Sequence, residues 1–348
     1  MVYSATSMRA LDQFGDSLYF AKKQTFFAIA GIFTMIAVAK TKSDLILKIS
    51  PLLMIVSLLS LILLLVPGLG HTANGSTRWL NVLGSSFRFQ PAEICKLVFV
   101  VYLCGYFLRK KRSIHSFKKG LLPPLFICGL TCTLLLAQPD FGSAVVVFAL
   151  FLIVSFMAGA RIKHLLGILA FCIPTLFLLL WTSPYRKQRL LSFLDPWGDP
   201  QNSGYQLLQS LTAFNNGHLF GRGLGNSHEK LYFLPEIHND FIASLIAEEL
   251  GFVGFTLFLA LYASLFYHCV LMIPKIKNAS KQLLVSGCLS LIGIQFLLNL
   301  CVITGLLPTK GLVLPLMSHG GTALITHLIC IGVLLSCLLY TSPSPRDS

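Results

Sequence analysis

The sequence has very few charged residues. Only 11% of its 348 residues are Asp, Glu, Lys or Arg, and 55% are hydrophobic, whereas a soluble domain carries about a quarter charged residues. A water-soluble fold of this length could not hide so much apolar surface from the solvent. The composition therefore excludes a soluble enzyme and predicts that lipid surrounds most of the chain.

Acidic residues are scarcer than basic ones. Lys and Arg total 27 against 13 Asp and Glu, which gives a formal charge of +14. In a soluble protein this excess would suggest nucleic acid, but cytoplasmic loops of membrane proteins collect Lys and Arg. We therefore expect membrane lipid and no nucleic acid as a partner. A lipid-headgroup or nucleic-acid site in the run 109–112 is the alternative.

The sequence also lacks metal-binding and disulfide patterns. All ten cysteines lie in apolar stretches, and none forms a CxxC motif with polar flanks. Free cysteine behaves as a small buried hydrophobe, so we expect neither a zinc site nor a disulfide framework. Residues 1–24 lack the charged and apolar regions of a signal peptide.

Long apolar runs are abundant, and a helix needs about 20 such residues to cross a membrane. Nine candidates are visible, with ends uncertain by a few residues: 25–40, 47–68, 92–109, 120–137, 143–160, 164–181, 252–273, 283–304 and 321–340. The sequence thus predicts an all-α polytopic membrane protein with a single transmembrane domain, 1–340. The tail 341–348 resembles a cloning or sequencing scar and is excluded from function.

The distribution of basic residues predicts the orientation. The segment 109–119 is strongly basic, and the linkers near 40–42, 161–163 and 275–281 also carry Lys or Arg. The positive-inside rule places these linkers in the cytoplasm. It therefore places 69–91, 138–142, 182–240 and 305–320 on the outer face.

The longest polar segment, 182–240, forms one large outer loop. It combines aromatic residues, turn-forming glycines and basic residues such as Arg186 and Arg189. This composition suits an anionic amphiphile as ligand, and it suits a structural cap equally well.

Carboxylates stand at three predicted outer helix boundaries. Asp240 ends the large loop, where capping of the next helix would alone explain it. Glu93 lies three residues before Lys96 on one helix face, so the two side chains can pair, and Asp140 precedes another helix. Charged groups at membrane depth are costly and mark functional sites, so the pattern predicts a cavity.

Several long motifs follow one another in a fixed order. They are Asn74-Gly75-Ser76-Thr77-Arg78-Trp79, Gln90-Pro91-Ala92-Glu93 with Lys96, Gln138-Pro139-Asp140-Phe141-Gly142, Leu234-Pro235-Glu236 with His238-Asn239-Asp240-Phe241, and Thr309-Lys310-Gly311 with Ser318-His319-Gly320-Gly321. This ordered set resembles the SEDS family (shape, elongation, division and sporulation), which includes FtsW, RodA and SpoVE. The segment 185–197 is more similar to its division members, the FtsW type. Asn239, His319 and Thr322-Ala323 depart from the family pattern, which usually has Thr, Tyr and Ser-Ser.

The resemblance implies a fold of ten helices, of which the first is absent here. It also implies a peptidoglycan glycosyltransferase that polymerises lipid II with inversion, forming a β-1,4 bond and releasing undecaprenyl pyrophosphate. The family's catalytic Asp corresponds to Asp240. We expect substrate contacts from Arg78, Trp79, Glu93, Lys96, Asp140, Arg186, Arg189, His238, Lys310 and Ser318. No cofactor is firmly implied, and a divalent cation, Mg or Mn, is a candidate.

The implied partners are a class B penicillin-binding protein, which is a transpeptidase, and other divisome proteins. The implied location is the bacterial inner membrane at the division septum, with the active site facing outside. Two alternatives remain open: a lipid II flippase, and a non-catalytic scaffold that holds a transpeptidase at the septum.

Overall fold

The computed structural model describes residues 1–68, 70–73, 76–81, 88–181, 184–202, 204–228 and 238–339. The tail 341–348 and the motif residues Asn74, Gly75 and 234–236 lie outside this described part. So does the side chain of Arg186.

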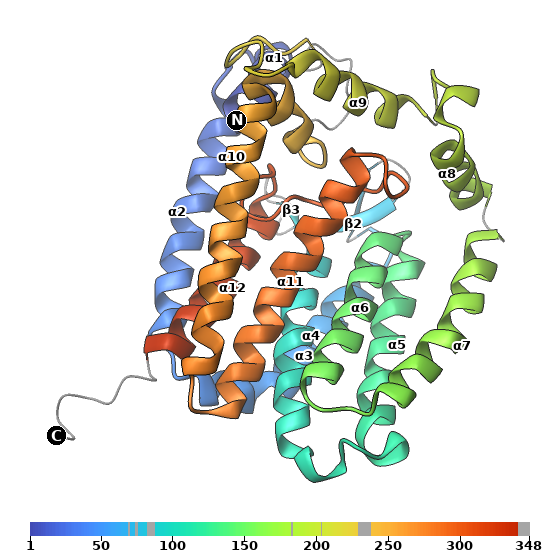
Figure 1. Cartoon of the computed structure of the whole chain (residues 1–348), viewed down its shortest axis with the longest axis vertical. Coiled ribbons are helices and arrows are strands. Elements are labelled where there is room, and N and C mark those ends of the chain that lie inside the picture. The colour runs from blue at the N-terminus through green and yellow to red at the C-terminus, as the bar shows by residue number, and fades with distance from the viewer. Residues whose placement is uncertain are drawn as a thin grey trace. The chain divides into compact units, whose positions relative to one another are not determined.

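The described chain is mostly helical, as predicted (Figure 1). All nine predicted spans are helices: α2 (Tyr19–Ala39), α3 (Ser43–Leu63), α4 (Pro91–Arg109), α5 (Leu122–Ala137), α6 (Phe141–Met157), α7 (Ile162–Trp181), α10 (Ile242–Met272), α11 (Ala279–Ile303) and α12 (Gly321–Leu339). Within the described residues, seven are long and apolar enough to cross a membrane, and the helical segments 141–157 and 162–175 are apolar but shorter.

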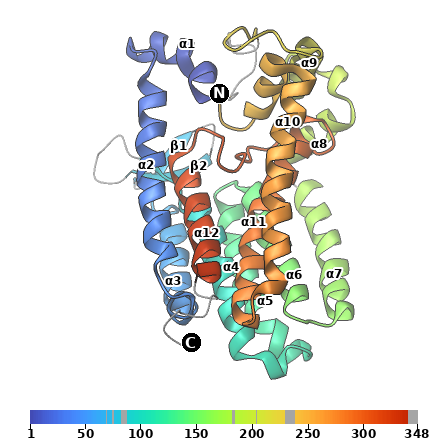
Figure 2. The ribbon, with the colours of Figure 1, turned by 60° about the vertical axis from the view of Figure 1, so that its left-hand side comes forward.

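Several shorter elements were not predicted. They include three helices, α1 (Val2–Phe14), α8 (Pro184–Leu194) and α9 (Tyr205–Gly217). They also include four short helical turns, η1 (Lys111–Ser113), η2 (Phe117–Leu121), η3 (Pro196–Gly198) and η5 (Ile273–Lys275). Three strands, β1 (Gly70–Ala73), β2 (Ser76–Asn81) and β3 (Arg88–Phe89), form a small antiparallel sheet in that order. The sheet lies beside the N-terminal end of α4 (Figure 2).

The chain divides into two compact units. The first comprises Met1–Phe26, Gly167–Leu265 and Gln295–Gly320, and the second comprises Phe27–Leu166, Phe266–Ile294 and Gly321–Ser348. The single transmembrane domain, 1–340, stays a prediction.

Helix α4 is the centre of the second unit. It packs against α3, α5, α6 and α12, and Phe99, Val100 and Leu103 are fully buried. The helix begins at Pro91, where the fixed φ of proline and its missing N–H suit the first helical position. The sequence therefore places Glu93 and Lys96 in the first two turns of the most buried helix of this unit.

In the first unit, α10 is broken at Gly251, whose φ is 68° and ψ is −169°. The N–H groups of Phe252 and Val253 donate to the carbonyls of His218 and Leu219 instead. The N–H groups of Arg222 and Gly223 donate to the carbonyls of Glu248 and Glu249. Because backbone polar groups at membrane depth need partners, the segment 217–223 satisfies the groups that the break leaves open.

Glycines make this close crossing possible. A Cβ on Gly221 would lie 2.2 Å from the carbonyl oxygen of Glu249, and a Cβ on Gly251 would lie 2.2 Å from the nitrogen of Gly221. The buried carboxylate of Glu248 accepts from the N–H of His228 at 2.9 Å and from the hydroxyl of Ser227. Glu248 therefore holds the large loop at residues 227–228 to α10, the helix that follows the turn carrying Asp240.

Candidate functional site

The candidate site in the first unit centres on the turn 238–240, which ends two residues before α10. Each of its three backbone carbonyls accepts a hydrogen bond. The N–H of His319 donates to the carbonyl of His238 at 2.9 Å, and the hydroxyl of Ser318 donates to the carbonyl of Asn239. The side-chain amide of Asn299 donates to the carbonyl of Asp240 at 2.8 Å. The backbone that carries the predicted catalytic carboxylate is thereby fixed at three consecutive residues.

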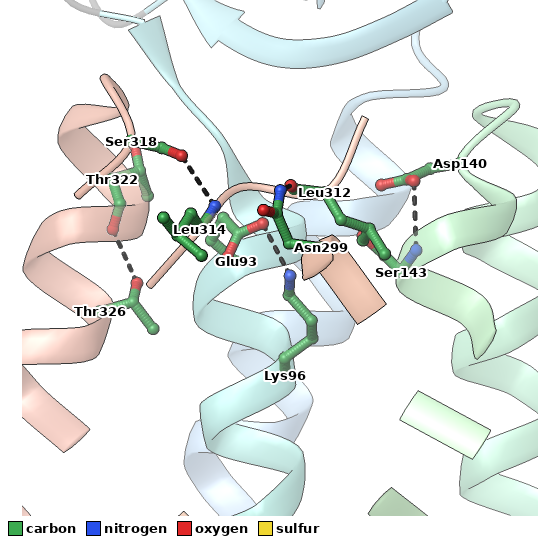
Figure 3. Close-up of polar contacts among 10 residues, drawn as sticks. All are labelled: Glu93, Lys96, Asp140, Ser143, Asn299, Leu312, Leu314, Ser318, Thr322 and Thr326. Carbon is green, nitrogen blue, oxygen red and sulfur yellow. Dashed lines mark hydrogen bonds and ion pairs between the residues drawn. The ribbon is translucent and has the colours of Figure 1, made fainter. Parts of the chain in front are cut away.

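The loop 305–320 supplies two of these donors and is itself held at several points. The carbonyl of Leu312 accepts from Asn299 at 2.6 Å, and the N–H of Leu314 donates to Ser318 Oγ at 2.7 Å (Figure 3). The hydroxyl of Tyr262 donates to the carbonyl of Pro315. A fixed loop can hold its neighbour in place, so this loop forms the rigid wall of the site.

This loop also approaches the Asp240 side chain closely. A Cβ built on Gly311 would lie 2.7 Å from Asp240 Oδ2, so a larger residue at 311 would have to displace the carboxylate. Asp240, taken as a whole residue, is only partly buried. Arg189 of α8 donates to the carbonyl of Thr309 at 3.1 Å. The guanidinium therefore lies against the backbone of the residue that precedes Lys310.

His238, the first residue of the turn, lies beside His319. The ring centroids of His238 and His319 are 5.9 Å apart, and Phe20 of α2 contacts both rings. Burial, and then the positive charge of Arg9, lowers the pKa of His238 from 6.5 to about 4. Burial, and then His238 and Lys23, lowers the pKa of His319 from 6.5 to about 4. Both imidazoles are neutral at pH 7.

These shifts predict that the protein loses stability in mild acid. In the unfolded chain His238 and His319 bind protons below pH 6.5, whereas in the folded chain these two residues do so only near pH 4. The stability contribution is therefore complete above pH 6.5 and falls as the pH drops from 6.5 towards 4. We expect the unfolding temperature in detergent to fall between pH 7.5 and pH 5.

Substitution of His319 by tyrosine removes one titrating group and should reduce this pH dependence. His115 is exposed on a different segment, so His115→Gln serves as the control and should leave the dependence unchanged. An equal loss of stability in wild type and His319→Tyr would contradict the assignment.

In the second unit, Glu93 and Lys96 form the predicted pair. Lys96 Nζ lies 2.7 Å from Glu93 Oε1, and the side chains are 1% and 5% exposed (Figure 3). His327 of α12, which is 1% exposed, interacts electrostatically with both. His327 was not predicted from the sequence, although a histidine inside an apolar span is itself a signal of function.

Three further predicted residues lie near one another in this unit. Arg78 donates to the carbonyl of Pro139 at 2.7 Å, and Asp140 Oδ1 accepts from the N–H of Ser143 at 3.2 Å and so caps α6. Trp79 on β2 stands opposite His71 on β1 in the register of the sheet. The structure thus joins Arg78 to the Asp140 loop. Contact of these residues with substrate stays a prediction, as does the cavity shared by the three carboxylates.

Two features escaped the sequence reading of the first unit. Asn299 is an amide in an apolar helix, which also holds Gln282 and Gln295, and the position of Asn299 inside an apolar span was the available signal. The close approach of Gly311 to Asp240 had no signal in a single sequence. Metal ligands do not gather: among the described residues, no group of three or more His, Cys, Asp or Glu side chains could hold a metal ion.

Comparison with known proteins gives a consistent result. A family model described as "Cell cycle protein" (FTSW_RODA_SPOVE) matches residues 1–342. The probable peptidoglycan glycosyltransferase FtsW of Nitrosococcus halophilus is 42% identical over 98% of this chain and 88% of its own length. Stage V sporulation protein E of Bacillus subtilis is 37% identical over 98% of this chain and 93% of its own length.

Solved structures show the same likeness. A chain from a structure of a peptidoglycan synthase complex, described as coordinating polymerization and crosslinking, superposes with a TM-score of 0.79 at 28% identity. That match covers 98% of this chain and 96% of the other. The rod shape determining protein RodA of Thermus thermophilus gives a TM-score of 0.67 at 26% identity, covering 98% and 95%.

Proposed function

Because this chain belongs to the FtsW/RodA/SpoVE family of cell cycle proteins, we propose that it is a peptidoglycan glycosyltransferase that polymerises lipid II. It is a bacterial membrane protein, with seven helices among the described residues long and apolar enough to span the bilayer. The observation that carries the proposal is the turn 238–240, whose three carbonyls all accept hydrogen bonds while Asp240 as a residue is only partly buried.

The chemistry requires a base and a place for negative charge. In our proposal the carboxylate of Asp240 takes the proton of the acceptor sugar's 4-hydroxyl as its oxygen attacks the donor's anomeric carbon. The bond from that carbon to undecaprenyl pyrophosphate breaks, and the electron pair leaves with the pyrophosphate. A single displacement inverts the α-linked donor and gives the β-1,4 bond.

Basic residues would stabilise the departing pyrophosphate. Arg186, Arg189 and Lys310 are the candidates in the first unit. Arg189 donates to the carbonyl of Thr309, next to Lys310. Arg78 and Lys96 are the candidates in the second unit. A divalent cation sharing this task stays a proposal. Among the described residues, no group of three or more His, Cys, Asp or Glu side chains could hold such an ion.

The experiment that tests this function uses purified protein, a class B transpeptidase partner and labelled lipid II. Polymer on a gel supports the glycosyltransferase. Transfer of lipid II across vesicle membranes without polymer would favour a flippase, and neither activity would favour a scaffold. A parallel reaction with chelator tests the divalent cation.

The proposal includes an orientation, with the loop 182–240 outside and the basic segment 109–119 in the cytoplasm. We expect a cysteine introduced at Asn202 to react with an impermeant reagent from outside, and one at Ser113 to react only from the cytoplasm. The reason is the positive-inside rule, and both positions are exposed or partly exposed. Each is introduced into a variant that lacks the native cysteines; labelling from the opposite sides would overturn the site assignment.

The partner and the location belong to the same proposal. Similarity to a chain from a complex described as coordinating polymerization and crosslinking supports a transpeptidase partner. Similarity to several FtsW proteins supports the division septum, with other divisome proteins as neighbours.

A further inference from the structure

We propose that Asn299 is a positioning residue, which sets the distance between the Asp240 carboxylate and the wall of the site. The proposal rests on the function proposed above, in which Asp240 is the base. Asn299 lies on α11 and is 1% exposed. An amide buried in an apolar helix is costly unless it is hydrogen-bonded, so its bonds must account for its presence.

Those bonds join two segments that are distant in sequence. Asn299 Nδ2 lies 2.8 Å from the carbonyl oxygen of Asp240 and 2.6 Å from that of Leu312. A primary amide has two N–H groups, and here each finds one carbonyl. Among the described residues, Asn299 Oδ1 has no hydrogen-bond partner. The amide nitrogen therefore carries the whole interaction.

The two carbonyls belong to the two sides of a tight contact. One is the carbonyl of Asp240 itself. The other, on Leu312, directly follows Gly311, whose Cβ position lies 2.7 Å from Asp240 Oδ2. Asn299 thus ties together the carboxylate and the surface against which it rests. If this bridge is lost, the carboxylate and the loop can separate.

The loss should appear in the rate of the chemical step. A displacement of about 1 Å at a reacting group costs on the order of 100-fold in rate. Substrate binding depends on many other contacts, so KM should change little. A positioning role therefore predicts a fall in kcat at nearly constant KM.

The test uses Asn299→Leu, which keeps the approximate size and removes the donor, and the milder Asn299→Ser. The matched control is Ser210→Ala. Ser210 is fully buried in the same unit and bridges the carbonyl of Ile303 on α11, at 2.7 Å, and the hydroxyl of Ser244 on α10, at 2.8 Å. Its two hydrogen bonds therefore go to α11 and α10 and do not involve the turn 238–240.

Lipid II polymerisation and thermal unfolding are measured on all variants, together with Asp240→Asn. We expect all three buried-polar variants to unfold at somewhat lower temperature. Of these three, the two Asn299 variants should lose kcat, by about 100-fold for leucine and less for serine, whereas Ser210→Ala should keep it. Rates are normalised to the folded fraction, and Asn299→Ser keeps the test valid if Asn299→Leu does not fold.

Two results overturn the inference in distinguishable ways. If Asp240→Asn is inactive while both Asn299 variants keep wild-type kcat, Asn299 is only structural and the proposed function stands. If wild-type protein makes no polymer, or Asp240→Asn polymerises normally, the proposed chemistry fails and the role of Asn299 falls with it.

Discussion

Replacing Asp240 by asparagine is expected to abolish glycan polymerisation while leaving the fold intact. Asparagine has the same size and keeps an oxygen for hydrogen bonding, but it cannot take a proton from the acceptor hydroxyl at neutral pH. Loss of a general base typically lowers rates by about 100-fold to 10,000-fold. The measurement is the initial rate of polymer formation from labelled lipid II, beside the unfolding temperature in detergent.

The structure explains why the fold should survive this change. The turn 238–240 is held through its backbone carbonyls, by His319, Ser318 and Asn299. None of these three bonds uses the carboxylate. Stability should therefore change little, and the loss of activity can be assigned to the side chain.

A second aspartate of the same loop provides the control. Asp195 Oδ1 accepts from the N–H of Gly198 at 3.1 Å and caps η3. Asparagine can keep that bond, so Asp195→Asn should polymerise at nearly the wild-type rate. If Asp240→Asn retains most of the activity, Asp240 is not the base.

Hydropathy was sufficient to predict the membrane helices. Runs such as 47–68 and 321–340 are apolar over about 20 residues, and the bilayer leaves few alternatives to a helix for such a run. The predicted span 252–273 matches the part of α10 that follows its break at Gly251. The part before the break, from Ile242, was not predicted, because it contains Glu248 and Glu249 and is therefore less apolar.

The site was predictable only in part. The helical spacing of Glu93 and Lys96 predicted their contact, because residues three apart share a helix face, and the pair is present at 2.7 Å. Asn299 was not predicted, since its partners at 240 and 312 are remote in sequence. The small sheet was missed as well, because its strands are only two to six residues long.

Lys96→Ala is expected to be strongly destabilising. Lys96 and Glu93 are 1% and 5% exposed, so removing the lysine leaves a buried carboxylate without its closest cation. Breaking a buried pair in this way typically costs about 3–5 kcal/mol. The double variant Glu93→Gln with Lys96→Met leaves neither charge of the pair and should recover most of the folding stability. The unfolding temperature in detergent checks both expectations.

An exposed pair with the same nitrogen–oxygen distance provides the control. Lys22 Nζ lies 2.7 Å from Asp16 Oδ2, and these side chains are 66% and 42% exposed. Water solvates each of these charges when the other is removed, so exposed pairs contribute little. Lys22→Ala should therefore leave the unfolding temperature almost unchanged. Comparing the two lysine variants isolates the effect of burial from that of distance.

The double variant also separates structure from substrate binding. If stability and polymerisation both return, the Glu93–Lys96 pair serves only the fold. If stability returns without polymerisation, one of the two charges contacts the substrate, and Lys96 is the candidate because the departing pyrophosphate needs positive charge. His327 interacts with both members of the pair. The single variant Glu93→Gln, which keeps Lys96, therefore tests whether the protein stays folded with the lysine charge alone beside His327. If every single variant is as stable and active as wild type, the pair contributes neither to the fold nor to catalysis.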